Sequence, residues 1–117
     1  MPRIEAELLA QANGLIAKGT SAANAAQTVT VAAPGAGKRN HLTGVVAIYD
    51  DASDHAITIT VNAVALVLNT GTGVNGLTFT GVDFQGAVNA TVTVGAVAGG
   101  VGVVSDVYAF YYVESGV

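Results

Sequence analysis

The residues of this sequence best suited to chemistry lie between positions 50 and 55. Asp50, Asp51, Asp54 and His55 stand close together there, and carboxylate oxygens are the ligands that Ca²⁺ takes in sets of about six to eight. Their spacing does not match the calcium-binding loop of an EF-hand. Short stretches with Asp and Ser between apolar segments are typical of turns, in which these side chains bond the backbone. The pattern therefore predicts a polar turn between two strands, and we predict no metal site.

A Gly-Lys pair at Gly37 and Lys38 raises the question of a phosphate-binding loop. That motif needs an earlier glycine, which frees the backbone to wrap the phosphates, and a Ser or Thr directly after the lysine to bind Mg²⁺. Ala32 stands at the first of these positions and Arg39 at the second. We therefore predict a hairpin loop over 34–39 with Lys38 and Arg39 in solvent, and no bound cofactor.

Nucleophilic catalysis would need a serine with a base beside it, and His41 and His55 are the only histidines. Neither Ser53 nor Ser105 lies in the Gly-x-Ser-x-Gly turn that exposes a nucleophilic serine. The acidic residues are scattered over turns and the N-terminal segment, so they predict no fixed carboxylate pair for glycoside cleavage. We predict that the protein has no catalytic residue and is not an enzyme.

The composition sets the class of protein and excludes one class of partner. The chain has 117 residues, enough for one domain, and only 10% of them are charged, compared with about 25% in typical proteins. The net charge is −4, and the few cationic side chains cannot neutralise many phosphates, so we predict no direct nucleic-acid binding. Without cysteine the fold has no disulfide, and its stability must come from packing.

No membrane segment is predicted. The longest uncharged stretch, 56–82, is long enough to cross a bilayer, but threonine, asparagine and glycine interrupt it throughout. Glu5 and Glu7 stand where a secretion signal would have a basic start, so we read no signal peptide.

The N-terminal segment is the one part with a helical pattern. Ile4, Leu8, Leu15 and Ile16 recur at helical spacing, and Gly19 marks a stop, so we predict an amphipathic helix over 3–18. A short helix is marginal in water unless its apolar stripe is packed, so these four residues are predicted to bind a partner surface. The predicted organisation is an N-terminal helix over 1–19, a small-residue linker over 20–26, and a β domain over 27–117.

From Gln27 onward, apolar residues alternate with threonine or asparagine, which is the two-residue period of half-buried strands. Six main strands are predicted, over 28–31, 41–49, 56–68, 77–80, 88–94 and 103–114. Within 56–68, apolar residues at first occupy one face of the predicted strand and threonine the other. After Asn62 the second face also carries apolar residues, Val64, Leu66 and Leu68, so that both faces become apolar. This change predicts either a bulge near Asn62 or a cover over the second face, from the helix or another subunit.

These elements predict a mainly β fold. Short strands separated by glycine-rich turns favour an antiparallel β-sandwich that is jelly-roll-like, preceded by one N-terminal amphipathic helix. A parallel α/β sheet is disfavoured because no helices separate the strands.

Two segments carry a resemblance to a known group of proteins. The string Gly-Lys-Arg-Asn-His-Leu-Thr-Gly-Val-Val-Ala-Ile-Tyr over 37–49 is similar to a strand start in the small β-sandwich structural proteins of tailed bacteriophages. The alternating string Phe-Gln-Gly-Ala-Val-Asn-Ala-Thr-Val-Thr-Val over 84–94, followed by a glycine-rich turn, also resembles that group. The resemblance covers roughly residues 28–112.

The resemblance implies a non-enzymatic virion component, either a capsid decoration or cement protein or a head-fibre protein. Such a chain is assembled into the virion in the host cytoplasm and binds the major capsid protein or another virion protein. Low charge and two-sided apolar strands independently predict a homo-oligomer, and a trimer fits the local symmetry of phage heads. The alternative is a receptor- or glycan-binding domain of a tail or fibre tip, which would use the glycine-rich loops 69–76 and 95–102.

Overall fold

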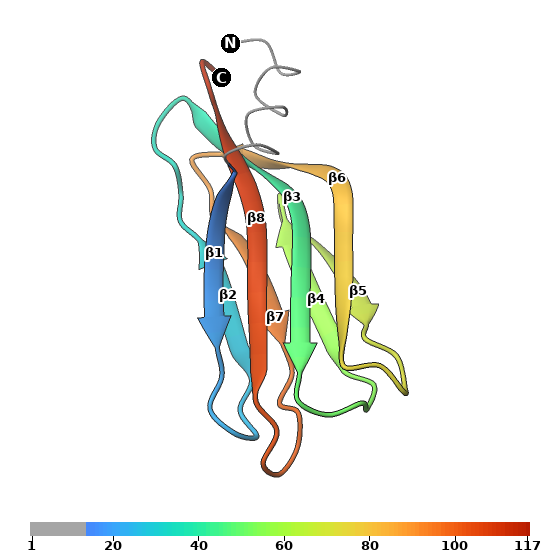
Figure 1. The fold of residues 1–117 in the computed structure, drawn as a ribbon. Coiled ribbons are helices and arrows are strands. Elements are labelled where there is room, and N and C mark those ends of the chain that lie inside the picture. The colour runs from blue at the N-terminus through green and yellow to red at the C-terminus, as the bar shows by residue number, and fades with distance from the viewer. Residues whose placement is uncertain (1–13) are drawn as a thin grey trace.

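A computed structural model describes residues 14–117, which form eight antiparallel strands in two four-stranded sheets (Figure 1). Sheet A has the strand order β1-β8-β3-β6 and sheet B has the order β2-β7-β4-β5. The strands of sheet A are β1 (Leu15–Thr20), β8 (Ser105–Ser115), β3 (Lys38–Tyr49) and β6 (Gly76–Val88). Those of sheet B are β2 (Gln27–Val31), β7 (Val92–Ala96), β4 (Ala56–Val61) and β5 (Val64–Asn69). The predicted mainly β fold with antiparallel sheets is confirmed.

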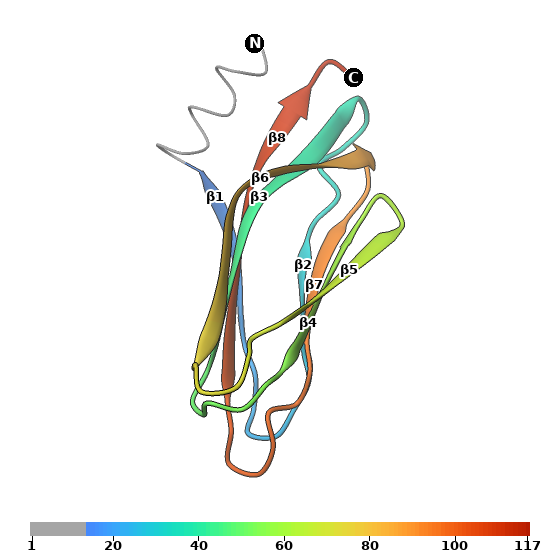
Figure 2. The same cartoon turned by 90° about the vertical axis from the view of Figure 1, so that its right-hand side faces the viewer.

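The core lies between the two sheets, which face each other in Figure 2. Successive side chains of a strand point to opposite faces, so the apolar member of each alternating pair enters the core. In β2, for example, Val29 and Val31 are buried, whereas Thr28 and Thr30 are exposed. The buried apolar core comprises Val29, Val31, Leu42, Val45, Ala47, Tyr49, Ile57, Ile59, Val92, Val94, Ala96, Val107 and Ala109.

The segment predicted as one strand over 56–68 is a hairpin. Asn62 and Ala63 both have positive φ, 51° and 61°, as a two-residue type I′ turn requires, and Val61 pairs with Val64 across it. The two residues that flank such a turn lie on the same face of the hairpin. Apolar residues of this face therefore stand at odd positions before the turn, up to Val61, and at even positions after it, from Val64 onward. The hairpin therefore replaces the predicted bulge near Asn62, and a cover from another subunit stays a prediction. Val64 and Val67 are 67% and 57% exposed.

Replacing Ala63 by glycine should stabilise the protein. A non-glycine residue in the left-handed region costs about 1–2 kcal/mol. Glycine relieves that strain but loses roughly 0.5–1 kcal/mol of chain entropy on folding. We expect Ala63→Gly to raise the free energy of unfolding, measured in urea by circular dichroism. Ala65→Gly, in extended β5, should lower it, and a loss of stability in Ala63→Gly would contradict the strain argument.

The N-terminal prediction is corrected where the structure describes it. Residues 15–18 are not the end of a helix but the start of β1, which pairs with β8 from Leu15↔Tyr111 to Thr20↔Asp106. Leu15 and Ile16 are neighbours on a strand, so they point to opposite faces and do not form one stripe. The expected linker over 20–26 carries the chain from β1 to β2. Ile4 and Leu8 lie outside the described residues.

The predicted strand over 88–94 is also divided. β6 runs on to Val88, Asn89 takes a left-handed conformation with φ 51°, and β7 begins at Val92 in the opposite sheet. The Asn89 side-chain oxygen accepts a hydrogen bond from Gly35 N, and the backbone N–H of Asn89 donates to Lys38 O. Asparagine is one of the few residues that adopts this conformation readily, which makes position 89 a turn.

Within residues 14–117, no helix is long and apolar enough to cross a membrane.

Candidate functional site

A buried histidine between two carboxylates is the most unusual polar feature of the structure. His41 lies in β3, directly opposite Tyr112 of β8, and it is fully buried. Its neighbour Leu42 belongs to the core, so the imidazole points to the other face of sheet A. A charged or polar side chain on that face would ordinarily reach solvent, so other elements must cover this one.

The cover comes from an irregularity in β6. The register of β3 with β6 shifts between the pairs Leu42↔Phe84 and Gly44↔Thr80, which leaves extra residues in β6. Gly81, with φ 76°, opens this bulge, and β6 bends across the end of the sheet beyond it (Figure 2). Bulges commonly redirect a side chain. Here the bulge places Asp83 over His41.

The contacts of His41 are short and use both ring nitrogens. Nδ1 lies 2.6 Å from Asp83 Oδ1, and Nε2 lies 2.7 Å from Glu114 Oε1. Tyr112 stacks on the imidazole at 4.5 Å between ring centroids and donates its hydroxyl to Asp83 Oδ2 at 3.2 Å. Arg39 Nε is 3.9 Å from Glu114 Oε1. We call His41, Asp83, Tyr112, Glu114 and Arg39 the histidine cluster.

The hydrogen bonds define what the histidine cluster can do chemically. Each ring nitrogen of His41 is engaged by a carboxyl group, Nδ1 by Asp83 and Nε2 by Glu114. In this arrangement neither nitrogen is open to a substrate or a metal ion. The geometry therefore joins β3, β6 and β8 through one buried side chain.

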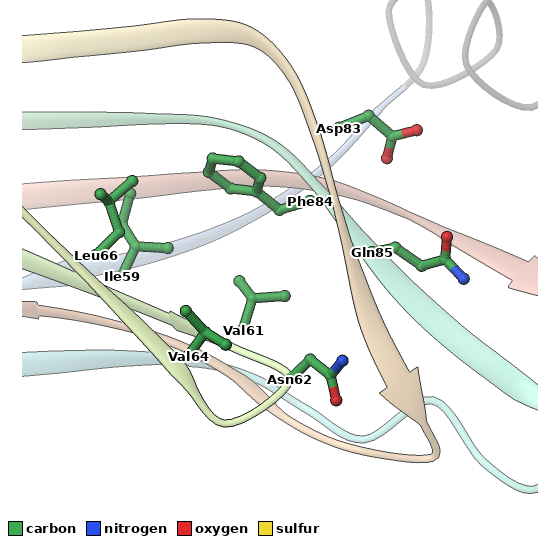
Figure 3. Close-up of a pocket in the computed structure, with 8 residues that line it drawn as sticks. All are labelled: Ile59, Val61, Asn62, Val64, Leu66, Asp83, Phe84 and Gln85. Carbon is green, nitrogen blue, oxygen red and sulfur yellow. The ribbon is translucent and has the colours of Figure 1, made fainter.

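An open groove lies beside the histidine cluster (Figure 3). It has a volume of about 420 Å³ and separates the β4–β5 hairpin from the bend of β6. Its lining is mainly apolar, with polar groups contributed by Asn62, Asp83 and Gln85. The apolar lining residues are Ile59, Val61, Val64, Leu66 and Phe84. The groove offers an apolar surface with a polar rim.

A second histidine contact lies in the turn between β3 and β4. His55 stacks on Tyr49 at 3.9 Å between ring centroids, and its Nε2 lies 2.6 Å from Asp51 Oδ1. The hydrogen bond with His55 holds the pKa of Asp51 below its ordinary value of 3.8. Burial raises the pKa of the Tyr49 hydroxyl above 10.0, and the Asp51 carboxylate adds to this effect. Tyr49 donates its hydroxyl to Val97 O at 2.7 Å.

The Asp51 contact should make stability depend on pH in acid. A carboxyl whose folded-state pKa is depressed contributes stability above its unfolded pKa, and this contribution is lost as the pH falls through the folded-state pKa. Asp51→Asn should therefore melt below the wild type at pH 6, and the difference in Tm should shrink below about pH 4. His55→Gln should reproduce the loss at pH 6. A Tm difference that stays constant from pH 6 to pH 2 would contradict the assignment.

The predicted polar turn at 50–55 is where the sequence placed it, and its oxygens bond the protein itself. Asp50 Oδ1 accepts from Val104 N, and Asp54 Oδ1 accepts from Gly71 N, both at 2.8 Å. These bonds tie the turn to the loops that follow β5 and β7. No group of three or more His, Asp or Glu side chains in the described part of the chain is arranged to hold a metal ion.

The loop over 34–39 departs from the prediction in two ways. It connects β2 of sheet B with β3 of sheet A, so it is not a hairpin. Lys38 is exposed, but Arg39 is only partly exposed and lies against Glu114 in the histidine cluster, so the expected solvated Lys-Arg pair is wrong. Lys38 N donates to Gly35 O within the loop.

The remaining candidates lie apart from the histidine cluster. Ser105 is buried, and its hydroxyl accepts from Gln27 Nε2 at 2.7 Å. Ser53 is exposed in the polar turn, where its carbonyl accepts from Thr70 Oγ1. Leu15 and Ile16 are 47% and 56% exposed at the edge of sheet A. Their binding of a partner, together with Ile4 and Leu8, stays a prediction.

Sequence reasoning considered His41 but missed its two carboxylate partners. Asp83 and Glu114 are 42 and 73 residues away from it. One signal was present in the spacing. Arg39 and His41 are two residues apart on one strand, so they lie on the same face, and the same holds for Tyr112 and Glu114 on another strand. Nothing in the sequence indicated that β3 and β8 are neighbours.

Comparison with known proteins found no relative of this chain. A scan against protein-family models found no matching family, and searches of curated proteins and of solved structures found no match.

Proposed function

We propose that the chain is a non-enzymatic structural protein of a tailed-phage virion, either a capsid decoration or cement protein or a head-fibre protein. It forms a homo-oligomer, for which head symmetry favours a trimer, and it binds the major capsid protein or another virion protein. It acts in the virion, which is assembled in the host cytoplasm. The proposal includes no bound cofactor, no nucleic acid and no membrane.

The observation that carries this proposal is the uneven distribution of charge between the sheets. The four strands of sheet B contain no Asp, Glu, Lys, Arg or His, whereas every strand of sheet A carries at least one of them. On its outer face sheet B presents mainly threonine and small apolar side chains, and β5 adds the exposed Val67. Such a surface suits burial against another protein better than exposure to water.

The strand order also supports a virion component. β1 pairs with β8, β2 with β7, β3 with β6 and β4 with β5. This is the order of a jelly roll, an architecture found in viral capsid domains and also in lectins. The fold by itself does not choose between these uses, because unrelated functions share such folds. The engagement of both His41 nitrogens supports a role without catalysis.

Fractionated virus particles test the proposal. Particles of a phage that encodes the chain would be purified, the heads separated from the tails, and each fraction analysed by mass spectrometry. We expect the chain in the head fraction, at many copies per particle. Its absence from both fractions would overturn a virion role.

The alternative, a receptor- or glycan-binding domain of a tail or fibre tip, has one structural observation in its favour. The glycine-rich loops after β5 and β7 lie at the same end of the sandwich, and both are bonded to the turn that follows β3 (Figure 1). Val101 in the second loop is 94% exposed. Recovery of the chain in the tail fraction, and loss of adsorption but not of particle stability on substituting these loops, would favour this alternative.

A further inference from the structure

We propose that β5 is the strand through which two copies of this chain associate, by antiparallel pairing about a two-fold axis at Val67. The inference takes from the proposed function only that the chain forms a homo-oligomer, and it makes the purified chain a two-fold dimer in place of the trimer that head symmetry favours. It is tested on the purified chain, so its failure would leave a role in the virion standing.

β5 is an edge strand without the usual protection. It is the last strand of sheet B, and it has β4 as its one neighbour in the described structure. Soluble proteins usually guard such edges with lysine, proline, a bulge or a covering loop. β5 reads Val-Ala-Leu-Val-Leu-Asn, contains no charge and no proline, and pairs with β4 without a register shift. Val64, Leu66 and Val67 are 67%, 39% and 57% exposed.

The type I′ turn determines which backbone groups face outward. The pair that closes a two-residue hairpin exchanges both backbone hydrogen bonds, and the hydrogen-bonded pairs then alternate along an antiparallel ladder. Val61↔Val64 is the closing pair, so Leu66 and Leu68 also bond to β4. The N–H and C=O groups of Ala65, Val67 and Asn69 therefore point away from β4, toward the free edge.

These outward groups match those of a second β5. With a two-fold axis at Val67, this residue faces its own copy, and Ala65 faces Asn69 of the other copy. All three residues then exchange both backbone bonds with their partners, which is the hydrogen-bonded pairing of an antiparallel ladder. The contact uses the same patch on both copies, as a two-fold interface must.

The side chains also favour a second copy over a charged partner. On the outer face Val67 meets Val67, and on the inner face Leu66 lies beside Leu68 of the other copy. No charged residue from either β5 enters the contact, although the chain has a net charge of −4. Val64 and Leu66 line the groove beneath the hairpin, so a paired strand would lie along its open side (Figure 3).

A charge placed at the axis tests the pairing. In Val67→Lys two lysines would face each other across the contact, and like charges directly opposite destabilise strand pairs. We expect light scattering of the purified chain to give a dimer for the wild type and a monomer for Val67→Lys, with both chains folded by circular dichroism. Thr30→Lys, an exposed position on the opposite edge of sheet B, adds the same charge and should remain a dimer. A monomeric or trimeric wild type, or a dimeric Val67→Lys, would overturn the proposal.

A cross-link tests the position of the axis independently of any loss of folding. The sequence has no cysteine, so Val67→Cys introduces a single thiol. Directly opposed hydrogen-bonded residues lie about 5.5 Å apart between Cα atoms, which is within the range of a disulfide. Mild oxidation should convert Val67→Cys largely to a covalent dimer on a non-reducing gel, whereas Thr30→Cys should stay monomeric on that gel. Equal cross-linking of the two variants, or none in Val67→Cys, would refute the two-fold contact.

Discussion

Replacing His41 by leucine should lower the free energy of unfolding by about 2–6 kcal/mol, because two carboxyl groups each lose a hydrogen bond whose loss costs about 1–3 kcal/mol. The imidazole is fully buried, and its side chain connects the carboxylates of Asp83 and Glu114. Leucine has a similar volume but no polar atoms, so Asp83 and Glu114 each lose the contact with the imidazole. Urea denaturation followed by circular dichroism measures the change.

A second substitution separates the lost hydrogen bonds from altered packing. Asp83→Asn, added to His41→Leu, should recover part of the stability, because a neutral amide that has lost its contact with the imidazole is less costly to bury than a carboxylate. In the wild-type background the same substitution should be destabilising. A loss below about 1 kcal/mol for His41→Leu would show that water replaces the imidazole at little cost.

Replacing Gly76 by alanine should cost about 1–3 kcal/mol, the range for forcing an extra carbon into a packed site. Gly76 begins β6 opposite Ile48, and a Cβ there would overlap the backbone carbonyl oxygen of Ala47. A carbonyl of the sheet cannot rotate away as a side chain does, so the strands must separate locally. The midpoint of urea unfolding reports the change.

Gly95 provides a matched control for this substitution. It lies within β7, its φ is not positive, and the nearest atom to an added Cβ would be Thr58 O at 3.8 Å, an ordinary contact. Gly95→Ala should leave stability unchanged or raise it slightly, since alanine has less freedom to lose on folding. Equal losses at the two positions would mean that the close approach at Gly76 is not the cause.

The sequence predicted the parts of the fold that depend on local patterns. The two-residue alternation at Val29 and Val31 identified a strand and its buried face, and the cluster of aspartates identified a turn. It failed at the β4–β5 hairpin because type I′ turns usually carry glycine, and Ala63 in that position gives no turn signal. Leu15 and Ile16 fitted a helix equally well, and pairing with β8 decided the outcome.

The candidate site was less predictable than the fold. His41 was considered only as a base for a nucleophilic serine, because the Asp83 contact depends on a bulge in β6 and the Glu114 contact on the pairing of β3 with β8. Both are tertiary features that a single sequence does not encode in its spacing. The two apolar faces of the stretch that contains β5 also predicted self-association, and this stays a prediction.

The place of β8 in sheet A has a consequence for how the protein is made. β8 lies between β1 and β3, and it is the strand with which β1 pairs. Until residues 105–115 have left the ribosome, β1 has no partner and β3 lacks one of its two neighbours. Sheet A therefore closes only after nearly all of its residues have been synthesised, and the long sequence separation of its pairs makes that closure slow. During this interval the apolar strands of both sheets are exposed, so the nascent chain is most vulnerable to aggregation immediately before its folding is complete.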